Sequence, residues 1–154
     1  MKNKLLVGWQ EWCALPDLHI PAIKAKVDTG AKTSSLHAFD IQPYRKMNKK
    51  HVKFSIHPLQ NNDNLRITAK ARVIDERDVV SSNGHKEHRY VIATTLELGD
   101  YAWDIELTLS NRDPMKFRML LGREALAGQV IVDPAKRVCQ TPLDGRKVKS
   151  LYRR

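Results

Sequence analysis

The stretch that organises this chain is Ala25-Lys26-Val27-Asp28-Thr29-Gly30-Ala31-Lys32-Thr33-Ser34-Ser35. Apolar residues alternate with lysines from Ile23 to Val27, which is the period-two pattern of a half-buried β-strand. Gly30 permits the backbone geometry of a tight turn just after that strand. The pattern therefore predicts that the strand delivers the carboxylate of Asp28 to a short, rigid loop.

Asp-Thr-Gly alone also suits an ordinary turn, because these residue types are favoured in turns for backbone reasons. A second segment supports more than a turn. It is Met119-Leu120-Leu121-Gly122-Arg123-Glu124-Ala125-Leu126, a compact apolar strand, a glycine and a short run of good helix formers. Together, the two segments resemble the retropepsin-like aspartic proteases.

In that family a strand ends in Asp-Thr-Gly-Ala, a flap hairpin follows, and a later apolar-apolar-Gly-Arg segment crosses behind the catalytic loop. The same parts occur here in that order, and the resemblance runs from about Val7 to Pro134. The chain resembles in particular a bacterial branch formerly labelled ATP-dependent zinc protease, which is related by context to glutamate-ligase systems. The resemblance implies an all-β, closed retropepsin-like barrel with one short helix after Gly122.

The resemblance also implies three groups of site residues: catalytic residues in the loop, substrate-binding residues beside it and in a flap, and residues that support the loop from behind. In that order they are Asp28, Thr29 and Gly30; Ala31, Ser82, Asn83 and Gly84; and Leu121, Gly122 and Arg123. Plain loop packing is the alternative for Thr29 and Ala31, and an ordinary exposed hairpin is the alternative for the flap. In viral retropepsins the arginine pairs with an acid just after Asp-Thr-Gly-Ala, but Lys32 stands there in this chain.

Aspartic proteolysis needs two carboxylates facing one water, one ionised and one protonated. The sequence contains a single Asp-Thr-Gly. The resemblance therefore implies a two-fold homodimer in which each subunit contributes one Asp28. Thr29 would then hydrogen-bond across the floor of the dimer.

The zinc and ATP labels find no support in the residues. The six histidines form no His-Glu-x-x-His motif, and no cysteine pair has ligand spacing. His85 and His88 are three residues apart on an expected hairpin, where that spacing puts them on opposite faces of a regular strand. A glycine-rich phosphate loop is also missing from the sequence. We therefore expect neither a metal nor a cofactor.

Length and charge set the remaining expectations. The 154 residues suffice for one domain, which we expect to span residues 1–135, followed by a loosely held basic C-terminal tail, residues 136–154. Lysine and arginine number 27 against 17 acids, so the formal charge of +10 favours acidic partners. Cys13 and Cys139 indicate free thiols in a reducing compartment. Without a signal-peptide pattern or an apolar span, we expect a cytoplasmic protein with no membrane partner.

Strand signals recur along the chain, with turns at regular spacing. The expected elements are strands at residues 36–41, 52–56 and 65–73, a basic loop at 43–50, an Asn-Gly turn at 83–84 and a Gly-Asp turn at 99–100. Many short strands separated in this way indicate a closed or nearly closed β-barrel, independently of the resemblance.

The sequence thus predicts a dimeric aspartic endopeptidase that cleaves a peptide or protein, with acidic or glutamate-extended peptides as the expected substrates. The alternative is a non-catalytic, basic β-barrel that binds RNA or an acidic protein, with Asp28 only shaping a loop. Against RNA, the aromatic residues are few and do not interleave with basic residues in the sequence. RNA nevertheless stays open as a partner.

Overall fold

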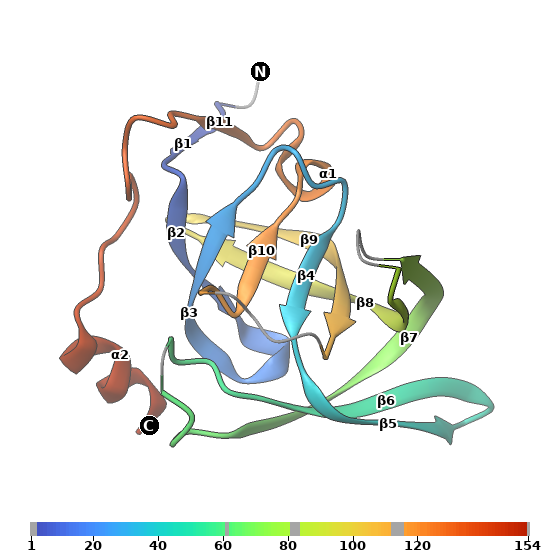
Figure 1. The fold of residues 1–154 in the computed structure, drawn as a ribbon. Coiled ribbons are helices and arrows are strands. Elements are labelled where there is room, and N and C mark those ends of the chain that lie inside the picture. Colours follow the sequence, from blue (N-terminus) through green and yellow to red (C-terminus); the bar gives the residue numbers. More distant parts are fainter. Residues whose placement is uncertain (1–2, 61, 81–83, 112–115, 154) are drawn as a thin grey trace.

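The structure is a computed structural model, and it describes residues 3–60, 62–80, 84–111 and 116–153 (Figure 1). It consists mainly of strands. They are β1 (Leu5–Val7), β2 (Gln10–Leu15), β3 (Ile20–Val27), β4 (Ser34–His37), β5 (Phe39–Lys46), β6 (Lys49–Ile56), β7 (Ile67–Val80), β8 (Lys86–Leu98), β9 (Tyr101–Ser110), β10 (Met119–Leu121) and β11 (Val130–Val132). The helical elements are the 3₁₀ turn η1 (Pro16–Leu18), α1 (Arg123–Leu126) and α2 (Gly145–Tyr152).

Six strands close into a barrel. Their order is β2-β3-β10-β4-β9-β8, and the pairing of Ala14 in β2 with Glu97 in β8 completes the circuit. Closure removes free sheet edges from the barrel wall. The expectation of an all-β, retropepsin-like barrel with a short helix after Gly122 is confirmed.

Alternating side chains make the core. On β3, Ile23, Ala25 and Val27 are buried and face the interior, as the period-two pattern predicts. Phe54 and Leu107 are among the largest fully buried side chains. Apolar residues of the barrel and of the adjoining strands form one continuous cluster, so the chain builds a single core.

Beyond β8, the sheet continues through β7, β6 and β5 as an arm at the side of the barrel (Figure 1). The expectation of a loop at residues 43–50 is wrong, because this stretch forms the hairpin of β5 and β6. Its turn uses Met47 and Asn48, both with positive φ (53° and 63°), as a type I′ turn requires. The strand expected at residues 36–41 is divided between β4, which ends at His37, and β5, which begins at Phe39. Within β5, Asp40 has a φ of 50° beside a register shift.

The basic C-terminal segment is packed against the barrel, so the expectation of a loosely held tail is wrong. The reason is a buried acid, Glu11 on β2. Its carboxylate accepts backbone N–H groups from Gly8 (2.8 Å), Cys139 (2.7 Å) and Gln140 (3.1 Å). A charged acceptor with three amide donors holds this part of the chain firmly.

Helix α2, which was not expected, ends the segment. Asp144 caps its first turn by accepting the Lys147 N–H at 2.9 Å. Val148 is buried, and the Tyr152 hydroxyl donates to the carbonyl of Ala22 on β3. The burial of Val148, the packing of Tyr152 against the core and its hydrogen bond to Ala22 therefore hold the helix on the barrel.

A second, two-stranded sheet lies beside the larger one. The short strands β1 and β11 pair in parallel, with Leu6 opposite Ile131, and both of these side chains are exposed.

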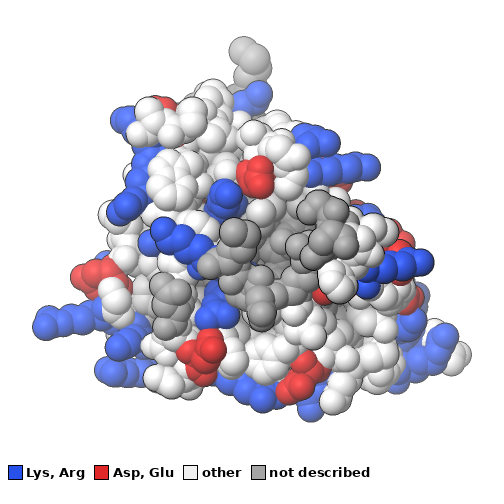
Figure 2. All heavy atoms as spheres, viewed as in Figure 1, with Lys and Arg blue, Asp and Glu red and all other residues white. Residues whose placement is uncertain are grey.

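Figure 2 shows that Lys and Arg side chains outnumber acids on the face seen in Figure 1. Within the described ranges, no helix combines the length and the apolar character needed to cross a membrane.

Candidate active site

The end of β3 fixes the position of Asp28. The Asp28 N–H donates to the Leu121 carbonyl at 2.9 Å, and the Asp28 carbonyl accepts the Ala31 N–H at 3.2 Å. Its side-chain Oδ1 accepts the Gly30 N–H at 2.9 Å. Asp28 is half-buried, so its carboxylate is fixed in direction and still reaches solvent.

Glycine at position 30 follows from this geometry. A Cβ built there would lie 3.2 Å from Asp28 Oδ1, which is tighter than an ordinary van der Waals contact. A side chain would therefore push against the carboxylate that the loop holds. Thr29 and Gly30 are both exposed.

The segment behind the loop is β10, which lies between β3 and β4 (Figure 1). It runs parallel to β3 and antiparallel to β4. Leu121 is fully buried, and Gly122 follows it at the point where the chain crosses behind the loop. The sequence-based pairing of the two segments is therefore seen directly in the sheet.

Gly122 is in close contact with the loop backbone. A Cβ there would lie 2.6 Å from the carbonyl carbon and oxygen of Thr33 and 2.9 Å from the Ala31 oxygen. The Gly122 N–H donates to Ser34 Oγ at 3.0 Å, and Ser34 is buried. Sequence analysis missed this role of Ser34, although a hydroxyl beside a buried strand is a recurrent hydrogen-bond partner.

Arg123 contacts backbone carbonyls of the loop, whereas the matching arginine of viral retropepsins pairs with an acid. Its side-chain Nη1 donates to the carbonyls of Gly30 (3.2 Å) and Thr29 (3.5 Å), while its backbone N–H donates to the Ala31 carbonyl at 2.8 Å. Lys32, which stands in place of the acid, lies 3.7 Å from Glu124 on α1. The arginine thus supports the loop through carbonyl oxygens. The Ala31 carbonyl connects the loop to α1, because it accepts the backbone N–H of Arg123.

The residues expected in the flap are only partly visible. Ser82 and Asn83 lie outside the described residues. Gly84 is exposed, has a φ of +85° and leads into β8. This conformation suits the expected turn, and the flap role of the β7–β8 hairpin stays a prediction.

An ionic clasp lies further along that hairpin, and sequence analysis did not anticipate it. The His88 ring contacts Asp78 through Nδ1 (2.9 Å) and Glu76 through Nε2 (2.8 Å). The two carboxylates raise the pKa of His88, Asp78 first, and hydrogen bonds from Lys50 and His88 lower the pKa of Glu76. Lys50 reaches Glu76 from β6 at 2.9 Å, so the clasp joins three strands.

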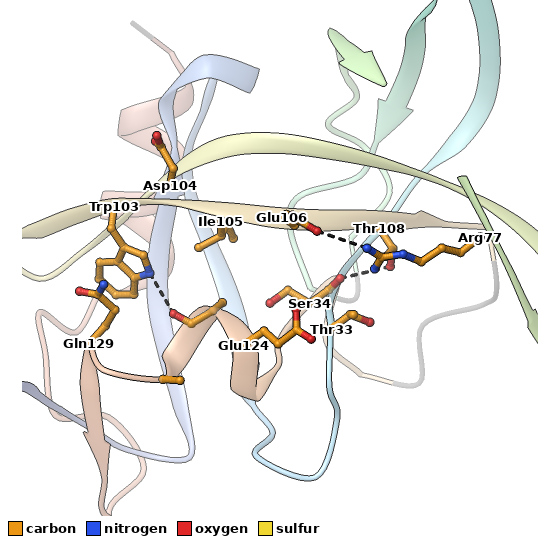
Figure 3. Close-up of a pocket in the computed structure, with 12 residues that line it drawn as sticks. Thr33, Ser34, Arg77, Trp103, Asp104, Ile105, Glu106, Thr108, Glu124 and Gln129 are labelled. Carbon is orange, nitrogen blue, oxygen red and sulfur yellow. Dashed lines mark hydrogen bonds and ion pairs between the residues drawn. The ribbon is translucent and has the colours of Figure 1, made fainter. Parts of the chain in front are cut away.

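A pocket of about 230 Å³ lies beside α1 (Figure 3). Trp103 donates its indole N–H to the Ala125 carbonyl at 2.9 Å on one side, and Arg77 meets Glu106 at 3.3 Å on the other. Asp28 is not among the residues that line it. The pocket is therefore not a cleft at the Asp28 carboxylate.

Clustered His, Cys, Asp and Glu side chains would indicate a metal site in the described part of the chain. There, no group of three or more His, Cys, Asp or Glu side chains is arranged to hold a metal ion. The chemistry open to the loop is that of a fixed, solvent-accessible carboxylate, which can take a proton from water.

Relatives of known sequence share most of this chain. A probable alpha-L-glutamate ligase from Shewanella halifaxensis is 48% identical over 150 residues, which are 97% of this chain and 33% of that protein. Another from Parasynechococcus marenigrum is 52% identical over 134 residues, 87% of this chain and 29% of that protein. The chain therefore spans about a third of the length of these relatives.

A solved structure shares the fold. It is the crystal structure of a protein of unknown function from Legionella pneumophila, with a TM-score of 0.70 and 27% identity over 88% of this chain and 98% of that one. A family model described as RimB-like, retropepsin-like aspartic endopeptidase RimB, matches residues 6–142. That match includes both the Asp28 loop and the segment behind it, and the chain accordingly belongs to the RimB-like family of retropepsin-like aspartic endopeptidases.

Proposed function

We propose that this protein is an aspartic-type endopeptidase that works as a homodimer, with one Asp28 from each subunit. The observation that carries the proposal is the fixed carboxylate at the end of β3. Its loop is bonded through Gly30 and backed by Gly122 and Arg123. Such rigid placement is what a catalytic carboxylate needs, because the rate depends on holding the reacting groups in position.

In the proposed reaction the two Asp28 carboxylates face one water. The ionised carboxylate takes a proton from the water, whose oxygen bonds to the peptide carbonyl carbon, while the protonated carboxylate donates to the carbonyl oxygen. The tetrahedral intermediate then breaks its C–N bond, and a carboxyl group returns a proton to the leaving nitrogen. No other reactant is required.

Two features support a dimer. The chain supplies a single Asp-Thr-Gly, so a second carboxylate of the same kind must come from another copy. The exposed Leu6 and Ile131 lie on the β1–β11 sheet, which is at the same end of the molecule as the Asp28 loop and α1 (Figure 1). An apolar surface at that end would be covered when two loops meet on a two-fold axis.

Acidic or glutamate-extended peptides are the proposed substrates. The net charge of +10 favours them electrostatically. The relatives named as probable glutamate ligases contain a region like this chain within a longer protein. A peptidase that acts on glutamate-containing chains would fit beside an enzyme that adds glutamate.

The test is hydrolysis of glutamate-extended and neutral peptides by the wild type and by Asp28→Asn, both with a chelator present. Asp28→Asn keeps the size of the side chain and removes the ionisable group from both subunits, so we expect turnover to vanish while the fold persists. Equal cleavage by both proteins would contradict the mechanism. Binding without any cleavage would favour the alternative of a basic binding module.

A further inference from the structure

A row of basic side chains extends from Asp28 along β3. The alternation of the strand places Lys24 and Lys26 on the face opposite the buried Ile23, Ala25 and Val27, and Asp28 is the first residue after the strand. Lys26 is exposed and Lys24 is half-buried. The spacing between alternate residues of a strand is roughly 7 Å, so the two lysines are regularly spaced along the strand that leads to Asp28.

Basic residues from two other segments come to this line. The carbonyl of Arg137 accepts the N–H of Gln10 at 3.1 Å, and Gln10 on β2 is paired with Lys26 on β3. Burial lowers the pKa of Lys24, and the positive charges of Arg137 and Lys116 lower it further. Arg137 belongs to the C-terminal segment, and Lys116 precedes β10. Among the described residues, no carboxylate forms an ion pair with any of these three cations. Positive charges are therefore gathered at the cost of mutual repulsion, which a bound anion would relieve.

Aromatic rings line the same face. Lys24 Nζ lies 5.3 Å from the centre of the Trp12 ring, and Lys116 Nζ lies 5.9 Å from that of Phe117. Trp9 meets Phe117 edge to face, with ring centres 6.4 Å apart. The backbone carbonyl of Trp9 also accepts the Val27 N–H at 2.9 Å, so the main chain at Trp9 lies beside the residue before Asp28.

We propose that this surface, the basic strip of Lys24, Lys26, Lys116 and Arg137, docks the acidic segment of an extended peptide whose scissile bond lies at Asp28. The inference rests on the proposed function in treating the bound peptide as a substrate. In Figure 2, basic side chains occur on the half of this face that carries β2, β3 and the C-terminal segment, with acids among them.

Peptide geometry favours this occupant over nucleic acid. An extended glutamate chain presents carboxylates on one side at the same roughly 7 Å period as the lysines of β3. Single-stranded nucleic acid is bound by stacking bases on open aromatic faces. Here the faces of Trp12 and Phe117 already lie under lysine ammonium groups, so the rings serve to position cations.

The experiment measures binding of a fluorescent ten-residue oligoglutamate to Asp28→Asn protein at low salt. In this background, Lys24→Gln, Lys26→Gln and Lys116→Gln are combined. The matched control combines Lys46→Gln, Lys53→Gln and Lys70→Gln, three exposed lysines of the β5–β7 arm. Both triple variants lose the same charge, so a general electrostatic effect would weaken both equally.

We expect the strip variant to bind about tenfold more weakly than its parent, and the control to change less than about twofold. Replacing the same three lysines by arginine should preserve most of the affinity, and thermal melts verify folding. Equal loss in the strip and control variants would overturn the docking surface. So would a uridine decanucleotide that binds more tightly than oligoglutamate and depends on the strip lysines.

The two proposals fail in different ways. If the wild type cleaves no peptide but oligoglutamate binding depends on the strip, the docking surface stands and the peptidase fails. If the wild type cleaves oligoglutamate and the strip variant without Asp28→Asn binds and cleaves as the control does, the peptidase stands and the docking surface is wrong.

Discussion

Replacing Gly122 by alanine should disturb the candidate site from behind. The added Cβ would lie 2.6 Å from the carbonyl carbon and oxygen of Thr33 and 2.9 Å from the Ala31 oxygen. All three atoms belong to the backbone, so no side-chain rotation relieves the overlap. Forcing an extra methyl group into a packed region costs about 1–3 kcal/mol. Since the contacts here are backbone and multiple, we expect a loss of about 3 kcal/mol in the free energy of unfolding.

The assay is urea denaturation followed by tryptophan fluorescence, with Gly145→Ala as the control. A Cβ at Gly145 meets nothing within 4 Å, and the residue starts helix α2. The control should therefore keep wild-type stability or gain up to about 1 kcal/mol. Gly122→Ala should also lower any peptidase activity, because the Asp28 loop must shift. A Gly122→Ala protein that unfolds at the same urea concentration as the wild type would refute this account of the loop.

Two further predictions concern other charged groups. Glu11→Gln puts an amide NH₂ against backbone donors and should lower the free energy of unfolding by about 3 kcal/mol. The Cys139 amide should then exchange its hydrogen faster. Unchanged exchange would contradict the anchoring role of Glu11. For the clasp, the pKa of His88 is raised above 6.5, so its contribution to stability is complete below that pH and is lost as pH rises through the folded pKa. The pKa values of Glu76 and Asp78 are lowered, so their contributions are present above 4.5 and 3.8 and are lost as pH falls through the folded values. The clasp should stabilise the hairpin most between about pH 4.5 and 6.5, and an NMR titration should show a lower His88 midpoint in Asp78→Asn.

Local patterns were enough to predict the centre of the fold. The alternation on β3, the Asp-Thr-Gly loop and the Leu121-Gly122 segment are each read from neighbouring residues, and the sheet pairs them as expected. The Gly99-Asp100 turn also forms, with a φ of +59° at Gly99. These features depend on short-range backbone preferences, which a sequence displays directly.

Other features depend on contacts between distant residues. Met47 and Asn48 adopt positive φ without a glycine, so their hairpin carried no strong turn signal. The basic C-terminal segment reads as a solvated tail, because its anchor, Glu11, lies more than a hundred residues away. The strip beside Asp28 was missed for the same reason, since Lys116 and Arg137 join Lys24 only in the folded chain.

The central claim is that two copies of Asp28 share one catalytic site, and mixing subunits tests it most directly. A fixed amount of wild type is equilibrated with a tenfold excess of Asp28→Asn, and peptide hydrolysis per wild-type chain is measured. With random exchange, about one wild-type chain in eleven retains a wild-type partner, so activity should fall to roughly a tenth. The same excess of an unrelated protein should have no effect. Activity per wild-type chain that stays constant across the mixing series would contradict the shared site.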